Sequence, residues 1–505
     1  MSDPVSPDTE SEAQAARLAF PRTQLRRRTA RGGLLNAVFL GGGEGLALLQ
    51  GLIVTALLSP VAIGLYGIVT TTAMTIVQLR RVGIDEAFVQ QSEADQQEEF
   101  QRAFSLELAV GLVFSLVVAA LAPVLAAVYG DDRLLWLTLA VSYLPLAFAL
   151  QAPQWVFHRR MDFLRLRLLQ FSIPAVTFAV TVPLAAATHS VWALVVGPLA
   201  GNAVAVAAAL VVSPYRLQLR FEREAAQRYL RFSWPIFATA LATLVVLQGQ
   251  VLAFDLDAGL AAAGFITLAA TLTRYADRAD HIVATTIYPA ICAVQDRPAT
   301  QRELFVKSTR ATMIWALPFC ALLILFAPDL VEHVLGDEWE PAVLLIQGLA
   351  AAAALQQVGY GWFSFYRARG ESRPQAVESA VMAAGFLGLA VPGLILFGVE
   401  GFVAGRIATS LAMLAVRRTY VRRLFADVEL GALALRGLAP VALASAATLA
   451  MREGLDLGAI PELAVFGGVF AVLTWAFERP LLGELMTYAG ERDTGRDPAG
   501  AGVAA

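Results

Sequence analysis

Apolar residues form long runs from Leu34 to Phe477, separated by short charged or Pro/Gly-containing stretches. A bilayer core about 30 Å thick needs roughly 20 apolar residues per helix, and most of these runs reach that length. The pattern therefore predicts an all-α integral membrane protein with about fourteen transmembrane helices. The expected spans lie near 34–58, 62–78, 103–128, 134–155, 168–186, 191–212, 232–254, 260–273, 309–327, 341–365, 375–397, 401–416, 437–451 and 462–477.

The composition agrees with lipid as the solvent. Hydrophobic residues make up 57% of the chain and charged residues only 16%, against about 25% charged in soluble domains. The longest predicted external connection is 328–340, which leaves no room outside for a catalytic domain. The two cysteines and four histidines show no metal-ligand or catalytic spacing. We therefore expect neither enzymatic activity nor a metal or other cofactor, and no nucleic-acid partner.

The basic residues have a strongly uneven distribution. If the chain starts inside and alternates, the cytoplasmic segments collect 35 of its 38 lysine and arginine residues. Only Arg133 and Arg452 fall in external turns, and only Arg406 lies well within a span, since Arg310, the second residue of the span 309–327, is counted with the cytoplasmic segments. The positive-inside rule therefore predicts that both termini are cytoplasmic, with a disordered tail over 1–33 and a second tail over 481–505.

Two pairs of segments suggest an internal repeat. The turn Ser59–Tyr66 is similar in kind to Gly259–Ile266, and the basic loop Arg159–Phe163 is similar to Arg367–Gly370. Two six-helix lobes and an extra helix pair would explain both similarities, although glycine turns outside and arginine loops inside occur in many membrane proteins. The predicted limits are 34–212 for the N-lobe, 213–231 for a cytoplasmic linker, 232–416 for the C-lobe and 417–480 for the extra pair.

An ordered series of short segments carries a family resemblance. It resembles the polysaccharide-transporter (Wzx-like) branch of the MOP flippase superfamily, which also contains the MATE exporters and the lipid II flippase MurJ. The segments that carry it are Leu57–Tyr66, Val82–Gln90, Ala103–Phe104, Arg159–Phe163, Val191–Val195, Tyr229–Pro235, Ile287–Asp296, Leu335–Ala342 and Ala368–Gly370.

The resemblance implies a MOP/MATE-like two-lobed bundle of six plus six helices, with two extra C-terminal helices. It further implies a flippase of the cell inner membrane that moves undecaprenyl-diphosphate-linked oligosaccharide outward by alternating access. The product would be a surface polysaccharide such as lipopolysaccharide, capsule or exopolysaccharide. A polymerase and glycosyltransferases of the same pathway are the implied partners.

Ionisable residues inside spans are candidates for substrate contact, because they cost about 2.5–3.5 kcal/mol at a helix centre unless they face a cavity or a partner. Glu44 lies near the middle of the first span and could serve as a protonation site, a cation-coupling site or a counter-charge. Arg274, Asp277 and Arg278 share one face at the end of the eighth span, where a guanidinium could bind a diphosphate. An ordinary cytoplasmic helix end is the alternative.

Further candidates are less central. Arg406 lies six residues inside the twelfth span, from where its side chain could also reach the interface. Arg80, Arg81 and Asp85 could form a cytoplasmic gate or could act only as topology determinants. Glutamines in spans could line a sugar-compatible cavity or hydrogen-bond one helix to another; they include Gln151, Gln154, Gln356 and Gln357.

Two other functions remain open on the sequence. A MATE-like antiporter of small molecules or cations would have the same two-lobed bundle. A polytopic membrane enzyme of polysaccharide assembly would be expected to show a large external loop or a catalytic histidine, and the sequence shows neither. An ion gradient is the expected energy source for transport, because the chain has no nucleotide-binding motif.

Overall fold

We analysed a computed structural model of the chain. It forms two compact units, 1–267 and 268–505, and every element among the described residues is a helix or a turn. The described residues are 22–80, 84, 88, 96–160, 162–220, 249, 251, 253–255, 259–278, 287–288, 291, 294, 297–369, 371, 373–455 and 458–490.

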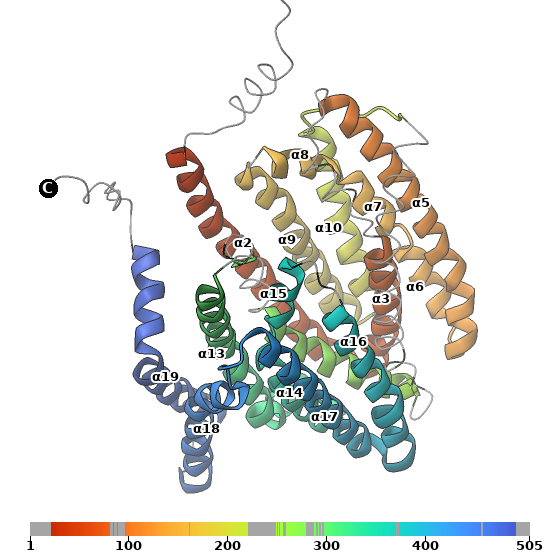
Figure 1. The fold of residues 1–505 in the computed structure, drawn as a ribbon. Coiled ribbons are helices and arrows are strands. Elements are labelled where there is room, and N and C mark those ends of the chain that lie inside the picture. The colour runs from red at the N-terminus through yellow and green to blue at the C-terminus, as the bar shows by residue number, and fades with distance from the viewer. Residues whose placement is uncertain are drawn as a thin grey trace, which may run out of the picture. The chain divides into compact units, whose positions relative to one another are not determined.

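The first unit is built from long helices and one interrupted span (Figure 1). The interrupted span consists of the short helices α6, α7 and α8. It is followed by the antiparallel pair α9 and α10, which pack along their lengths. Helical residues 259–267 complete the unit. The labelled helices are α2 (Arg22–Leu57), α3 (Pro60–Arg80), α5 (Gln96–Tyr129), α6 (Arg133–Val141), α7 (Leu144–Leu150), α8 (Pro153–Arg159), α9 (Phe163–Thr188) and α10 (Trp192–Val211).

The second unit also consists of long helices and one interrupted span, and it has an additional helix pair, α18 and α19. Helix α17 contains a backbone reversal at Gly398, so its first part pairs with its second part as a hairpin. The elements are η1 (Tyr275–Asp277), α13 (Pro298–Leu330), η2 (Val331–Leu335), η3 (Asp337–Trp339), α14 (Ala342–Gln357), α15 (Trp362–Ala368), α16 (Arg373–Gly385), η4 (Phe386–Ala390), α17 (Val391–Leu424), α18 (Leu430–Leu455) and α19 (Ala459–Gly490).

The prediction of a multi-pass helical membrane protein is confirmed, whereas the number fourteen stays a prediction. Eight helical stretches in the described part of the chain are long and apolar enough to cross a membrane, or nine if the bent pair α14 and α15 is one span. Shorter apolar helices at Gly41–Leu57 and Pro60–Met74 coincide with the first two predicted spans. Most of the predicted seventh span, 232–254, lies outside the described residues.

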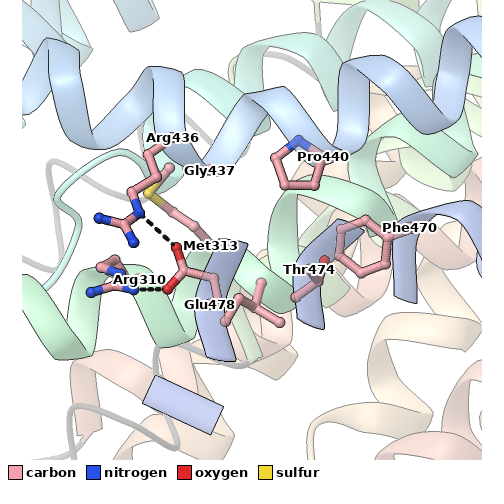
Figure 2. Close-up of a pocket in the computed structure, with 9 residues that line it drawn as sticks. Arg310, Met313, Arg436, Gly437, Pro440, Phe470, Thr474 and Glu478 are labelled. Atoms are coloured by element: carbon pink, nitrogen blue, oxygen red, sulfur yellow. Dashed lines mark hydrogen bonds and ion pairs between the residues drawn. The ribbon is translucent and has the colours of Figure 1, made fainter. Parts of the chain in front are cut away.

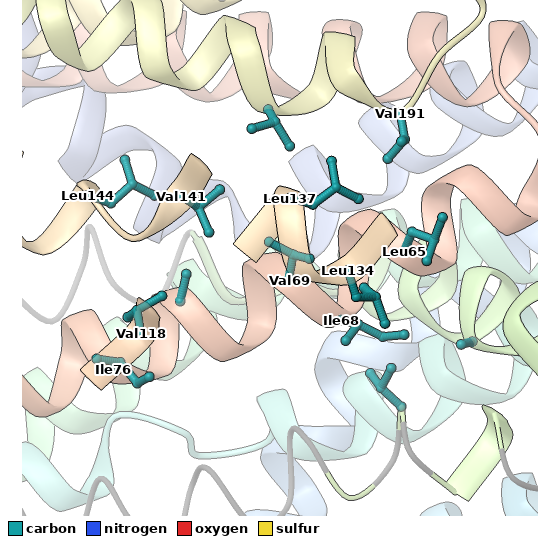
Figure 3. Packing of buried hydrophobic residues seen from close by; sticks show 14 residues of the cluster. Leu65, Ile68, Val69, Ile76, Val118, Leu134, Leu137, Val141, Leu144 and Val191 are labelled. Atoms are coloured by element: carbon teal, nitrogen blue, oxygen red, sulfur yellow. The ribbon is translucent and has the colours of Figure 1, made fainter. Parts of the chain in front are cut away.

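The helices expose many large apolar side chains, as expected when lipid replaces water. Leu112, Val113 and Leu116 of α5 are 50–62% exposed, although all three are strongly hydrophobic. Residues of α3, α5 and α6 also pack into a buried apolar cluster that includes Val69 and Leu137 (Figure 3). A soluble protein would leave so many exposed apolar side chains only at an interface.

The two units contain the same succession of elements. In each, a long helix ends at a glycine with positive φ, Gly130 or Gly336, and two acidic residues follow. An interrupted span and a seven-residue helix come next, and then a helical hairpin turns at a residue with positive φ, His189 or Gly398. The two basic loops whose similarity the sequence predicts lie at the ends of the seven-residue helices α8 and α15.

An ion pair holds the turn between α5 and α6 in the first unit. The guanidinium of Arg133 bonds both carboxylate oxygens of Asp131, with Nη2–Oδ2 at 2.6 Å and Nε–Oδ1 at 3.0 Å. The side-chain hydrogen bond from Arg133 holds the pKa of the Asp131 carboxyl below its usual value. The second unit has Trp339 at the matching place in the sequence, and its side chain is fully buried.

Glycine allows the two turns that resemble each other in sequence to pack against one another. A Cβ on Gly64 of α3 would clash with the carbonyl oxygen of Leu260, and a Cβ on Gly264 would clash with the carbonyl oxygen of Pro60. This reciprocity means that α3 and residues 259–267 cross with backbone on backbone. Small residues at a helix crossing permit such close approach in membranes.

The crossing yields a test. Gly64→Ala should lower the thermal stability of the purified protein, because overpacking typically costs about 1–3 kcal/mol. Gly51→Ala on α2 is the matched control: nothing lies within 4 Å of the added methyl group, so it should be neutral or slightly stabilising. Melting curves of both variants in the same detergent compare them. Equal melting temperatures would contradict the close crossing.

Candidate functional site

The break between α14 and α15 exposes backbone groups that lipid cannot satisfy. The bent pair turns by 44°, Val358 is extended and Gly359 has a φ of +68°. Arg417 of α17 supplies the missing donors, because its Nη1 donates to the carbonyl oxygens of Gln356 and Val358, the latter at 2.8 Å. An unsatisfied carbonyl in the hydrocarbon region costs several kcal/mol, so this arginine makes the broken span possible.

Arg417 is neutralised where it stands. Its guanidinium bonds the Glu378 carboxylate of α16 through Nη2 at 2.7 Å, and its side chain is only 2% exposed. Glu378 also accepts from the indole of Trp362, the first residue of α15, at 3.2 Å. The carbon Cζ of Arg417 lies 5.5 Å from the ring centre of Tyr360. One ion pair therefore ties α14, α15, α16 and α17 together.

The break in the first unit is surrounded by hydrogen bonds between neutral side chains. The chain breaks at Gln151 and Ala152, and Gln151 Nε2 donates to Asn202 Oδ1 of α10 at 3.1 Å. Gln154 donates to Gln151 at 3.1 Å, and all three side chains are buried. In the second unit Gln356 likewise donates to Ser410 of α17 at 2.9 Å. Of the two roles open to these glutamines, helix-to-helix hydrogen bonding is the one the structure displays.

Helices α18 and α19 are bound to α13 by an ionic cluster at each end. In the first, which we call the Glu478 triad, Glu478 of α19 pairs with Arg310 of α13 and with Arg436 of α18, Nε–Oε1 being 3.2 Å (Figure 2). In the second, the Arg452 triad, Nη2 of Arg452 lies 2.6 Å from Glu462 and 2.7 Å from Asp329. The extra helix pair is therefore fastened to a span of the second unit.

Glu44 lies in the unbroken helix α2 and is half-buried. Its neighbours Gly42 and Gly43 approach Phe171 and Pro174 of α9 only at ordinary van der Waals distances. The glycines around Glu44 therefore bring α2 near α9 without backbone contact, and α2 does not break there.

The cluster predicted at the eighth span comes together around its acidic member. Asp277 accepts a hydrogen bond of 2.7 Å from Gln357 Nε2 at the end of α14, while Arg274 and Arg278 are exposed and close enough to act on its charge. Residues 275–277 tighten into a 3₁₀ turn, which changes the spacing of the regular helix that the sequence predicted. Asp277 therefore stands directly beside the break stabilised by Arg417.

Arg406 is the candidate whose environment differs most from water. It lies on the face of α17 that also carries Phe402, Thr409 and Met413, all of them buried. Its Nε is buried and has no hydrogen-bond partner among the residues that the structure describes. No carboxylate within the described ranges forms an ion pair with it.

The candidate gate lies largely outside the described residues. Arg80 ends α3, whereas Arg81 and Asp85 are outside the part of the chain that the structure describes.

Sequence reasoning missed the Arg417–Glu378 pair and the Glu478 triad. The predicted spans leave Arg417 and Arg436 in the segment between spans twelve and thirteen, and Glu478 just beyond the last span, and so predict exposure for all three. One signal was present: Glu378 lies three residues inside the predicted span 375–397, where an acidic residue needs a partner.

The arrangement of helices is that of a known class of membrane transporter. The structure resembles the lipid II flippase MurJ in an inward closed conformation with a TM-score of 0.69, 11% identity and coverage of 89% of this chain and all of that one. It resembles an inward-facing multidrug resistance MATE transporter with a TM-score of 0.62, 13% identity and coverage of 76% and 96%. The chain therefore has the fold of the MOP superfamily.

Sequence comparison then identifies the family. The profile described as "Polysaccharide biosynthesis protein" matches residues 53–344, more than half of the chain, and the protein belongs to this family. A relative, the succinoglycan biosynthesis transport protein ExoT of Rhizobium meliloti, is 22% identical over 301 residues, 57% of this chain. The chain spans 58% of that relative's length. The predicted resemblance to the polysaccharide-transporter branch of the MOP superfamily is confirmed.

The buried ion pair predicts an asymmetry between its two members. Arg417→Met should destabilise more than Glu378→Gln, because it leaves a buried carboxylate without its counter-ion and also removes the donor to two carbonyl groups; losing one partner of such a pair costs about 3–5 kcal/mol. Thermal unfolding in detergent measures the difference, and the exposed neighbour variant Arg418→Met should melt like the wild type. A larger loss for Glu378→Gln would contradict the role assigned to Arg417.

Proposed function

We propose that the protein is a flippase that moves undecaprenyl-diphosphate-linked oligosaccharide from the cytoplasmic to the outer leaflet of the inner membrane. The observation that carries the proposal is the match to a polysaccharide biosynthesis family in a chain with the MOP fold. The printed role of the relative ExoT, transport in succinoglycan biosynthesis, supports a transported polysaccharide precursor. The product would be lipopolysaccharide, capsule or exopolysaccharide, and a polymerase and glycosyltransferases would be partners.

We infer that the chain has fourteen spans in two six-helix lobes, 34–212 and 232–416, with an extra pair in 417–480. The shared succession of elements in the two units supports this layout. The lobes would be joined by the linker 213–231 and flanked by the tails 1–33 and 481–505. The charge distribution supports cytoplasmic termini, since 35 of 38 basic residues then lie inside.

Substrate binding is assigned first to Arg406. A polyprenyl diphosphate is an anion that must cross a medium in which charge is costly, and a pre-positioned guanidinium offsets that cost by bidentate, charge-assisted hydrogen bonds. The Nε of Arg406 is buried and, among the described residues, no carboxylate pairs with this side chain and would compete with the substrate. A structural arginine such as Arg417 is by contrast already neutralised by Glu378.

The remaining candidates have secondary roles in this proposal. Arg274 and Arg278 flank Asp277 at the predicted cytoplasmic end, where they would meet the diphosphate on entry. Glu44 would couple transport to a cation or proton. Arg80, Arg81 and Asp85 would form the cytoplasmic gate.

The proposal is tested in a deletion strain by measuring lipid-linked oligosaccharide on the cytoplasmic face. The wild-type gene should abolish its accumulation, whereas Arg406→Gln should lower transport at least tenfold, since a hydrogen bond to a charged group contributes about 1.5–3 kcal/mol. Arg418→Gln, an equal charge change on an exposed residue of the same helix, should restore transport fully. Glu44→Gln and Arg274→Ala test the secondary roles in the same assay.

The outcomes separate the rival functions. A lipid-linked pool unchanged by the deletion would reject the flippase and favour a MATE-like antiporter, which a drug or cation efflux assay would then detect. A changed polymer length with normal translocation would favour a membrane enzyme of polysaccharide assembly. Full activity of Arg406→Gln would reject the assigned site but not the function.

A further inference from the structure

The Glu478 triad borders a shallow, open pocket between α13, α18 and α19, with a cavity volume of about 10 Å³. Figure 2 shows Arg310 and Arg436 directed at the carboxylate of Glu478, with Thr474 and Phe470 farther along α19. Two guanidinium groups face one carboxylate, so the charged end of the pocket has a net positive charge. It lies at the end of the three helices that the positive-inside rule predicts to be cytoplasmic.

Arg436 can bind a further anion without losing its present contacts. Its Nε pairs with Glu478 and its Nη2 donates to the carbonyl oxygen of Phe477 at 3.0 Å. A guanidinium carries five N–H donors in a fixed plane, so the remaining donors of Arg436 point away from these two partners. The side chain is 48% exposed, whereas Glu478 is 5% exposed. The outward edge of Arg436 is therefore open to a ligand arriving from the membrane surface.

Beyond the charged end the pocket becomes apolar. The lining residues there are Met313 of α13, Pro440 of α18 and Phe470 of α19. Each lies three or more residues farther along its helix, toward the middle of the predicted span, than the arginine or glutamate of the triad on that helix. From Glu478 to Phe470 the wall of α19 runs about 12 Å at 1.5 Å per residue. A site with a cationic rim and an apolar wall of this depth suits the head and upper chain of a lipid.

Thr474 distinguishes between kinds of lipid. It lies between Glu478 and Phe470 on the pocket wall, and its hydroxyl is buried with no hydrogen-bond partner among the described residues. One helical turn below the charged end is the depth at which a glycerophospholipid carries its ester carbonyl groups. Such a carbonyl would accept from Thr474, whereas a polyprenyl diphosphate has no ester carbonyl to offer.

We propose that this pocket is a binding site for a resident anionic glycerophospholipid of the inner leaflet, its phosphate on Arg436 and an ester carbonyl on Thr474. The lipid is distinct from the transported substrate. It would lie along the open surface of this pocket, at the end where the Glu478 triad holds α13, α18 and α19 together. The proposal does not depend on transport, because binding is measured on the purified protein.

Native mass spectrometry of the full-length protein, titrated with phosphatidylglycerol and with phosphatidylcholine, tests the site. Phosphatidylglycerol should bind about tenfold more tightly than phosphatidylcholine, whose choline cancels the phosphate charge. Arg436→Gln should remove about tenfold of that affinity, since tenfold corresponds to 1.4 kcal/mol and one charge-assisted hydrogen bond is lost. Thr474→Val should weaken binding about threefold, and Arg418→Gln should leave it unchanged.

Two results would overturn the proposal. Equal phosphatidylglycerol affinity in the wild type and Arg436→Gln would mean that the pocket does not hold the phosphate. Tighter binding of undecaprenyl phosphate than of phosphatidylglycerol, insensitive to Thr474→Val, would assign the pocket to the transported lipid instead. Both variants should fold, because Arg436 is half-exposed and valine has the shape of threonine. A failure of flipping in cells would leave these binding results intact.

Discussion

The described helices and their breaks depend on one constraint: a backbone N–H or C=O in hydrocarbon must have a hydrogen-bond partner within the protein. Unbroken helices meet it locally, but both units contain a span that breaks. The second unit then needs a guanidinium, Arg417, to reach the carbonyl oxygens of Gln356 and Val358, and the guanidinium in turn needs Glu378. In the first unit the break consists of tight turns, in which the N–H groups of Gln151 and Ala152 donate to the carbonyl oxygens of Phe148 and Ala149.

The need for a partner also distinguishes arginines that hold helices together from arginines that can bind an anion. Arg417, Arg310 and Arg452 lie beside carboxylates and hold helices together, so they offer little to a substrate. Arg406 and the outward edge of Arg436 are different, because each presents donors that no described carboxylate occupies. The two sites proposed for anions, one for substrate and one for a resident lipid, follow from that contrast and from position along the helix.

Much of the fold could be predicted from sequence because span length and arginine placement reflect one-dimensional constraints. Predicted spans such as 168–186 and 191–212 coincide with α9 and α10, and the turn Ser59–Tyr66 does pack on its counterpart. The ion pairs could not be predicted, because Arg417 and Glu378 are 39 residues apart and meet only when α16 and α17 fold together. The positions of Glu44 and Arg406 along their spans could be predicted, but the surroundings of each could not.

The two triads that fasten α18 and α19 to α13 also act as a ruler for the bilayer. Arg310 to Asp329, Arg436 to Arg452 and Glu462 to Glu478 enclose apolar stretches of about 24–28 Å at 1.5 Å per residue. Because ions at both ends lock the three helices in register, none can slide by a turn to suit a thicker membrane. Hydrophobic mismatch must then be met by tilting the three helices as one body, so membrane thickness becomes a variable to which this protein is sensitive.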